Sequence, residues 1–150
     1  MITMEKTNRI KWSEFNKAIP DDDFYYLRSC IRQNFFPGSE KVFLDILGKK
    51  LGKKIFDDPK HTTCTGIGYH ADIIPFETLQ TVAARHFSLM AEKGIRSAVV
   101  SCITSFGIYS EILDTWQHFP KELEKTRNFL RKATGREFEV PEYIVHASDT

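Results

Sequence analysis

Cysteine is scarce in this chain of 150 residues, which contains three cysteines and no Cys-x-x-Cys pair. An odd number of widely spaced cysteines argues against a disulfide framework and for a reducing compartment. The missing pairs also exclude the common zinc-ribbon signatures. An excess of charge of one sign is also lacking, because 21 basic residues are balanced by 20 acidic ones. Since the global basic field of a nucleic-acid-binding protein is absent, we expect no nucleic-acid partner.

Long hydrophobic runs are lacking as well. The longest apolar stretch, residues 95–113, is interrupted by Arg96, Gly107 and Glu111 and falls short of a membrane span. The first residues, MITMEKTNRIKW, are rich in charge and hold no apolar segment of the kind that a signal peptide needs. These two observations predict a soluble, cytoplasmic protein with no membrane span.

Aromatic residues, in contrast, are plentiful. The chain has 12 Phe and 5 Tyr, and a folded chain of this length buries roughly 68–70% of its unfolded surface. No repeat or Pro/Gly-rich linker divides the sequence, so we expect one α/β domain over residues 24–150. Residues 1–23 differ mildly, because Trp12 and Phe15 have helical spacing ahead of Pro20. This segment is predicted to be an N-terminal arm or docking helix.

Short strand patterns alternate with longer helical patterns from residue 24 onward. The strand candidates are residues 24–27, 54–56, 97–101 and 143–145, and the helical patterns cover residues 37–52, 76–93, 108–116 and 121–133. In the helix that opens at Pro37, Phe43, Ile46 and Leu47 share the expected apolar face. Helical segments between strands indicate βαβ units and a parallel sheet. We therefore predict an α/β domain of three layers, with about four mainly parallel strands flanked by helices.

Each cysteine follows a predicted strand. Cys30 comes after the first strand, Cys64 lies in the loop after the second, and Cys102 follows the third. The carboxyl ends of parallel strands meet at one edge of a sheet, where open α/β sheets bind ligands. Cys102 also directly precedes a helix, whose N-terminal amides lower a thiol pKa and favour the thiolate. The spacing therefore predicts that the three thiols share a site at this edge.

Several segments around these cysteines resemble the cysteine-rich (CCG) domain of the heterodisulfide reductase family. That domain carries a lone cysteine, then Cys-Cys-Gly, then Cys-x-x-Cys. The intervals in this chain are similar, with 33 residues between Cys30 and Cys64 and 37 between Cys64 and Cys102. The resemblance covers residues 24–148. The segments that carry it are Ser29-Cys30 with Phe36-Pro37-Gly38, Cys64-Thr65-Gly66, Ala83-Ala84-Arg85-His86-Phe87 and Cys102-Ile103-Thr104-Ser105.

The resemblance implies redox chemistry. In that family paired copies of the domain hold noncubane iron–sulfur clusters that cleave a disulfide substrate. Carried over, Cys30 matches the lone cysteine, Cys64 the first of Cys-Cys-Gly, and Cys102 the first of Cys-x-x-Cys. The implied function is that of an oxidoreductase subunit for electron transfer or thiol/disulfide reduction. Its implied partners are other subunits of a redox complex, or a further copy of this chain, and a thiol or disulfide substrate.

Two departures from the family pattern define alternatives. Thr65 and Ser105 stand where the second cysteines of the two motifs are expected, and a hydroxyl is a poor ligand for iron or zinc. Three thiolates can hold a smaller cluster whose fourth ligand comes from a partner. They can also bind zinc with a nearby nitrogen, for which His70 is the natural candidate.

The losses at Thr65 and Ser105 favour a further hypothesis of another class. In it the chain is a degenerate, cluster-free domain that serves as a structural or assembly partner. A third hypothesis is a metal-free thiol enzyme with Cys102 as its nucleophile.

The remaining polar residues have simpler interpretations. His61 is a weaker ligand candidate than His70, and His86 lies on the apolar stripe of its helix and is expected in the core. Gly66 is expected to supply backbone freedom beside the cysteine site. Asp57 and Asp58 are expected in a solvated turn.

Overall fold

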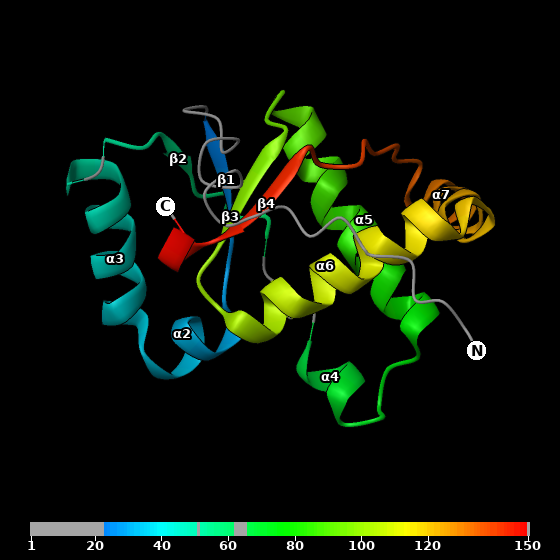
Figure 1. Ribbon diagram of the computed structural model, residues 1–150, viewed down its shortest axis with the longest axis horizontal. Coiled ribbons are helices and arrows are strands. Elements are labelled where there is room, and N and C mark those ends of the chain that lie inside the picture. Colours follow the sequence, from blue (N-terminus) through cyan, green and yellow to red (C-terminus); the bar gives the residue numbers. More distant parts are fainter. Residues whose placement is uncertain (1–22, 51, 62–65, 150) are drawn as a thin grey trace, which may run out of the picture.

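The computed structural model describes residues 23–50, 52–61 and 66–149 (Figure 1). The expected N-terminal arm, except for its last residue, and Cys64 lie outside these residues. The elements, in chain order, are β1 (Phe24–Leu27), α2 (Cys30–Phe35), α3 (Pro37–Asp45), the π-helix η1 (Ile46–Lys50), β2 (Ile55–Phe56), α4 (Ile67–His70), α5 (Phe76–Glu92), β3 (Ser97–Val100), α6 (Ile103–His118), α7 (Pro120–Thr134), β4 (Tyr143–His146) and the 3₁₀-helix η2 (Ala147–Asp149).

The four strands form one parallel sheet in the order β2-β1-β3-β4. All four residues of β1 and of β3 are buried, as expected of parallel strands that are covered on both faces. In the central pairing Leu27 lies opposite Val100, and Val100 in turn lies opposite His146 of β4. The predicted fold class, an α/β domain with about four mainly parallel strands, is confirmed.

Two hydrophobic clusters, one on each face of the sheet, hold three layers together (Figure 1). Because successive strand residues point to opposite faces, Tyr26 and Val99 pack with Leu47 on the side of α3. Tyr25 and Ala98 instead belong to the larger cluster, which α5 and α6 cover. The helix α7 packs on α5 and α6 from outside.

The predicted helix that opens at Pro37 is only partly correct. Its α-helical part, α3, ends at Asp45, and the five residues Ile46–Lys50 form a π-helical turn. This wider turn changes the side-chain period, so Leu47 is buried whereas Ile46 is 47% exposed. Ile46 therefore does not share the apolar face on which the spacing placed it.

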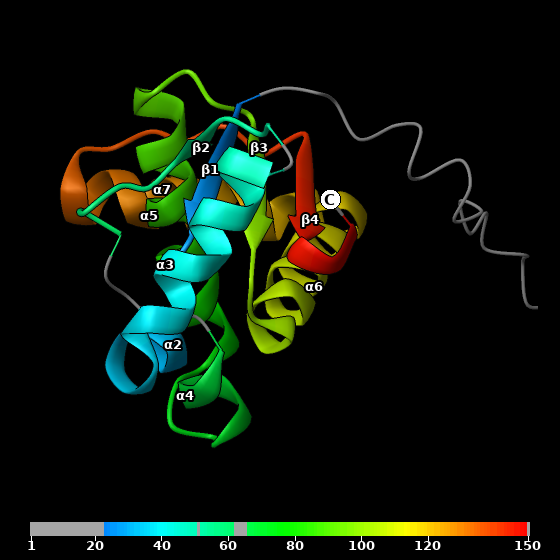
Figure 2. The same cartoon turned by 90° about the vertical axis from the view of Figure 1, so that its left-hand side faces the viewer.

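Two short helices, α2 and α4, have no counterpart in the predicted pattern. They contain six and four residues, which is too short for apolar periodicity to show. Figure 2 places α2, α4 and the first turn of α6 beyond the same end of the strands. In the described parts of the chain, no helix combines the length and apolar character needed to cross a membrane.

A buried hydrogen bond between two helices provides a test of this packing. The indole Nε1 of Trp116 donates to Oε1 of Gln80 at 2.6 Å. We expect Trp116→Phe to lower the free energy of unfolding by about 2–4 kcal/mol, because it leaves a cavity and removes the shorter of the two hydrogen bonds to Oε1 of Gln80. Urea denaturation measures this loss. The exposed substitution Phe129→Ala is the control and should change stability by less than about 0.5 kcal/mol; equal effects of the two variants would contradict the packing described.

Candidate functional site

Two of the three cysteines lie at the carboxyl edge of the sheet, at the ends of neighbouring strands. Cys30 is the first residue of α2 and Cys102 is the N-cap residue of α6. Both side chains are partly exposed. The chain leaves β1 toward the α3 face and leaves β3 toward the α6 face, so the two cysteines flank a topological switch point. Open α/β sheets bind their ligands at such a point.

A buried serine precedes each of these cysteines and fixes the backbone there. Ser29 caps α2, because its side chain accepts a hydrogen bond from the backbone N–H of Arg32 at 3.3 Å. Ser101 bonds the hydroxyl of Tyr26, which is fully buried, across the two strands at 2.8 Å. The end of β1 is therefore tied to the start of α2, and the ends of β1 and β3 are tied to each other, directly ahead of the thiols.

The surroundings of Cys102 favour its thiolate form. Burial raises the pKa of the Cys102 thiol, but the backbone N–H and hydroxyl groups of Ser105 and Thr104 outweigh burial and hold the pKa below its ordinary value. Ser105 and Thr104 lie in the first turn of α6, so the groups at the start of this helix stabilise the thiolate. The expected depression of the thiol pKa at this helix start is therefore found.

The position of Cys64 stays a prediction, but Gly66, the last residue of its motif, is described. Gly66 is buried, and a Cβ atom at this position would lie 2.8 Å from Cγ2 of Thr104, in the first turn of α6. Its φ of −117° is open to any residue. The expectation that Gly66 supplies backbone freedom is therefore wrong: it allows the close approach of the chain to the helix that starts at Cys102.

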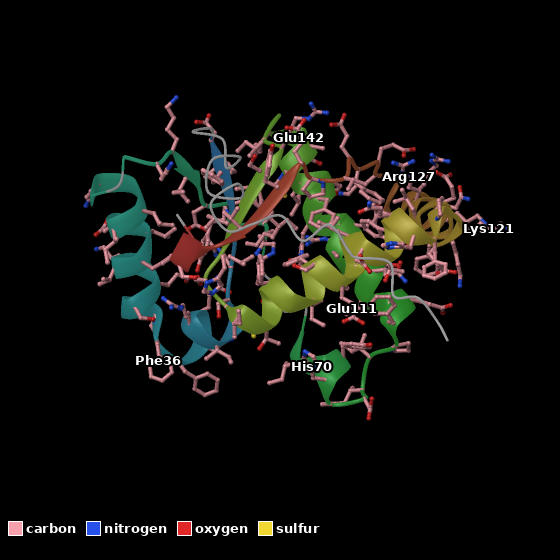
Figure 3. The ribbon with its side chains drawn as sticks, in the orientation of Figure 1. Phe36, His70, Glu111, Lys121, Arg127 and Glu142 are labelled. Atoms are coloured by element: carbon pink, nitrogen blue, oxygen red, sulfur yellow. The ribbon has the colours of Figure 1, made fainter. Side chains whose placement is uncertain are left out.

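His70 is exposed at the end of α4, and its expected role as a fourth ligand stays a prediction. Figure 3 shows it at the end of the molecule opposite Glu142, the same end at which the chain turns at Phe36 after α2. Among residues 23–50, 52–61 and 66–149, no group of three His, Cys, Asp or Glu side chains is arranged to hold a metal ion. Cys30, Cys102 and His70 therefore make no metal centre by themselves, and ligation by all three thiols stays a prediction.

Exposed apolar side chains occur on the elements at this end of the molecule. They come from α2, from α4 and the turn after it, and from the first residue of α6, elements that lie at one end of the molecule (Figure 2). Large exposed apolar patches on proteins mark contact surfaces for partners. These residues, which we call the apolar rim, are Ile31, Phe35, Phe36, Ile67, Ile73 and Ile103.

A pair of buried histidines lies beside the site and was not recognised as such from the sequence. His61 and His86 are 1% and 0% exposed, and their ring centroids are 4.0 Å apart. Nδ1 of His86 bonds the hydroxyl of Tyr109 at 2.7 Å, which confirms that His86 belongs to the core. Nε2 of each histidine is buried without a hydrogen-bond partner. No spacing signal links two residues that are 25 positions apart, so only the fold reveals the pair.

Burial determines the protonation of both rings. Burial, followed by the charges of Arg28 and Arg85, lowers the pKa of His61 to about 4. Burial also lowers the pKa of His86 well below its ordinary value, and His61 and Arg85 act in the same direction. Both imidazoles are therefore neutral near pH 7.

Asp58 was expected in a solvated turn, and this expectation is wrong. The side chain is 3% exposed, and its Oδ1 accepts the backbone N–H of Lys60 at 2.9 Å. Its other oxygen, Oδ2, is buried without a partner, as is the hydroxyl of Tyr25. Burial and, after it, Asp58 raise the pKa of Tyr25. The segment from Asp57 to His61 therefore turns inward and places polar groups against β1.

The comparisons with known proteins inform the fold. No family model and no curated protein sequence matches the chain. The chain is similar to a crystal structure of a hypothetical protein from Helicobacter pylori, with a TM-score of 0.64 and 16% sequence identity. The match covers 95% of this chain and 30% of the Helicobacter chain, so the present chain spans less than a third of that protein. At this identity the likeness establishes the arrangement of helices and strands.

The low pKa of Cys102 gives a direct test of the helix start. We expect the alkylation rate of Cys102, followed by mass spectrometry, to have a pH midpoint below the value of about 8.5 for a free thiol. Ser105→Ala should move this midpoint upward, because it removes the hydroxyl that helps to stabilise the thiolate. Ser110→Ala, whose hydroxyl bonds Phe106 further along α6, is the control and should leave the midpoint in place. A midpoint that is the same in all three proteins would contradict this description.

The buried histidines predict a loss of stability in mild acid. Because their pKa values are lowered by folding, the unfolded chain binds protons below pH 6.5 before the folded chain does. The free energy of unfolding therefore falls as the pH drops from about 6.5 toward 4, and His61 alone contributes about 3 kcal/mol over this window. Urea denaturation at pH 6.5 and 5.5 measures the slope. In His61→Asn the slope should shrink by roughly one proton, about 1.4 kcal/mol per pH unit, whereas His118→Asn, at an exposed position, should keep it.

Proposed function

We propose that this chain is a redox domain that works within a larger complex, in electron transfer or in thiol/disulfide reduction. The observation that carries the proposal is the placement of Cys30 and Cys102 on either side of the β1/β3 switch point. It agrees with the resemblance to the cysteine-rich domain of the heterodisulfide reductase family. The three cysteines that match the family motif are the residues we assign to the site.

The described residues supply part of the ligand set that an iron–sulfur cluster needs. Iron in such clusters is bound by thiolates, and the first turn of α6 favours the thiolate of Cys102. Cys30 lies at the same edge. Ser105 is buried and cannot act as a soft ligand, so its hydroxyl serves Cys102 instead of metal. Cys30, Cys64 and Cys102 would hold the cluster, which supplies one-electron transfer when bound, and a partner would complete the ligand set.

The apolar rim supports the expectation of a partner at this edge. Its members come from elements at the end of the molecule where α2 and α6 begin (Figure 2), and Phe35 and Ile73 are 74% and 76% exposed. Apolar surface of this extent is stabilised by covering it with another protein. We propose that this partner is a redox subunit, whose own apolar surface covers the apolar rim and shields the thiols from water.

A second candidate function has its own support. Threonine and serine replace the expected second thiolates at positions 65 and 105. These features suit a cluster-free domain, or one with structural zinc, that contributes the apolar rim to the assembly of a complex.

Metal analysis after anaerobic purification separates these candidates. The redox proposal predicts iron and acid-labile sulfide in the purified chain, with at least a several-fold loss in Cys30→Ser and in Cys102→Ser. His118→Ala, an exposed substitution near the end of α6, is the control and should keep the metal. Zinc alone would support the structural alternative. Protein free of iron and zinc, with partner binding unchanged in both cysteine variants, would overturn the redox proposal and leave the assembly domain.

A further inference from the structure

The connection between β1 and Cys30 is held at two points by the segment that follows β2. The backbone N–H of Arg28 donates to Nδ1 of His61 at 3.1 Å. The guanidinium Nε of the same residue donates to Oδ1 of Asp57 at 2.6 Å. We call these three residues the Arg28 clamp. Arg28 lies between the last residue of β1 and the Ser29 cap, so the clamp acts directly on the turn that presents Cys30.

The clamp requires a particular state of His61. Since Nδ1 accepts a backbone N–H, it carries no proton, and the neutral ring holds its proton on Nε2. Protonation would turn Nδ1 into a donor that faces another donor and would break the bond to Arg28. Burial of the ring opposes this protonation. The charged groups that act on the ring are Arg28, Arg85, Asp57 and Asp58, while Tyr25 and His86 pack against it.

Contacts from His61 also reach the helix that begins at Cys102. The ring of His61 packs on the ring of His86 from α5, and His86 bonds the hydroxyl of Tyr109 from α6 at 2.7 Å. The sequence of contacts thus runs from the Cys30 turn through His61 and His86 to α6. All three aromatic side chains are at most 1% exposed, which keeps the connection dry and rigid.

We infer that His61 is a positioning residue for the thiol site. It holds the turn that presents Cys30 through the Arg28 amide and, through His86 and Tyr109, fixes this turn relative to the helix that starts at Cys102. The inference deepens the proposed function, because it gives His61 a role in placing the two thiols. It rests on that proposal for what the thiols do once they are in place. This inference can be tested on metal-free protein.

The test compares two substitutions of His61 in the full chain after removal of metals by a chelator. His61→Asn keeps an acceptor oxygen close to the position of Nδ1, whereas His61→Leu removes it. The readouts are the exchange rate of the Arg28 amide, followed by NMR, and the alkylation rate of Cys30, followed by mass spectrometry. Leu130→Ala is the control for lost stability, because Leu130 is a buried residue of the outer helix α7.

In His61→Leu we expect exchange of the Arg28 amide to accelerate by about tenfold or more, since its only described acceptor is lost. Alkylation of Cys30 should accelerate by about threefold or more, because the turn is released. His61→Asn should keep both rates within about twofold of the original protein. If His61→Asn accelerates both rates as much as His61→Leu does, or if Leu130→Ala has an equal effect, then His61 has only a general packing role and the inference is overturned.

A pH profile gives a second, independent readout. In the original chain, protection of the Arg28 amide should decline as the pH falls from 6 toward the pKa of His61, about 4. In His61→Asn this decline should be absent, because the amide oxygen does not titrate. The same decline in both proteins would overturn the role of the His61 acceptor. If the clamp behaves as expected but the chain binds no metal in the analysis above, the redox proposal fails and the positioning role stands.

Discussion

Four residues of β1 pair in parallel with four residues of β3, and the chain leaves these two strands toward opposite faces of the sheet. This divergence leaves a switch point between the carboxyl ends of the two central strands, the kind of place at which open α/β sheets bind ligands. Cys30 and Cys102 occupy the first helical turn on either side of the opening. Everything that we attribute to the thiols depends on this pairing, because a shift in its register would separate the two helix starts.

The two described cysteines have different surroundings at this shared edge. Cys102 begins a helix of 16 residues, whose first-turn groups lower its pKa, whereas Cys30 begins a helix of six residues. Ser105 takes part in this asymmetry. It stands where the resemblance expects a second thiolate, and its hydroxyl stabilises the thiolate of Cys102.

The polar groups buried beneath the edge carry a cost that packing alone does not require. Nε2 of His61 and Nε2 of His86 are enclosed between β1, the segment after β2, and α5 without a hydrogen-bond partner. Each such atom costs about 1–3 kcal/mol relative to a partnered one. Apolar side chains of similar size would fill this space at lower cost. The cost makes sense if the bond from the Arg28 amide to His61 holds the thiol-bearing turn.

The alternation of strand and helix patterns was enough to predict the parallel sheet and its three layers, because an uncharged, fully buried strand such as β3 and a long amphipathic helix such as α5 stand out in the sequence. The same patterns located Cys30 and Cys102 after strands, and so at one edge. The sequence could not reveal α2, α4 or the π-turn at Ile46, since short and irregular helices lack a distinct period. It also gave no sign of the burial of His61 and Asp58. Only the tertiary structure decided those features, because they result from contacts between segments that are distant along the chain and follow no local pattern.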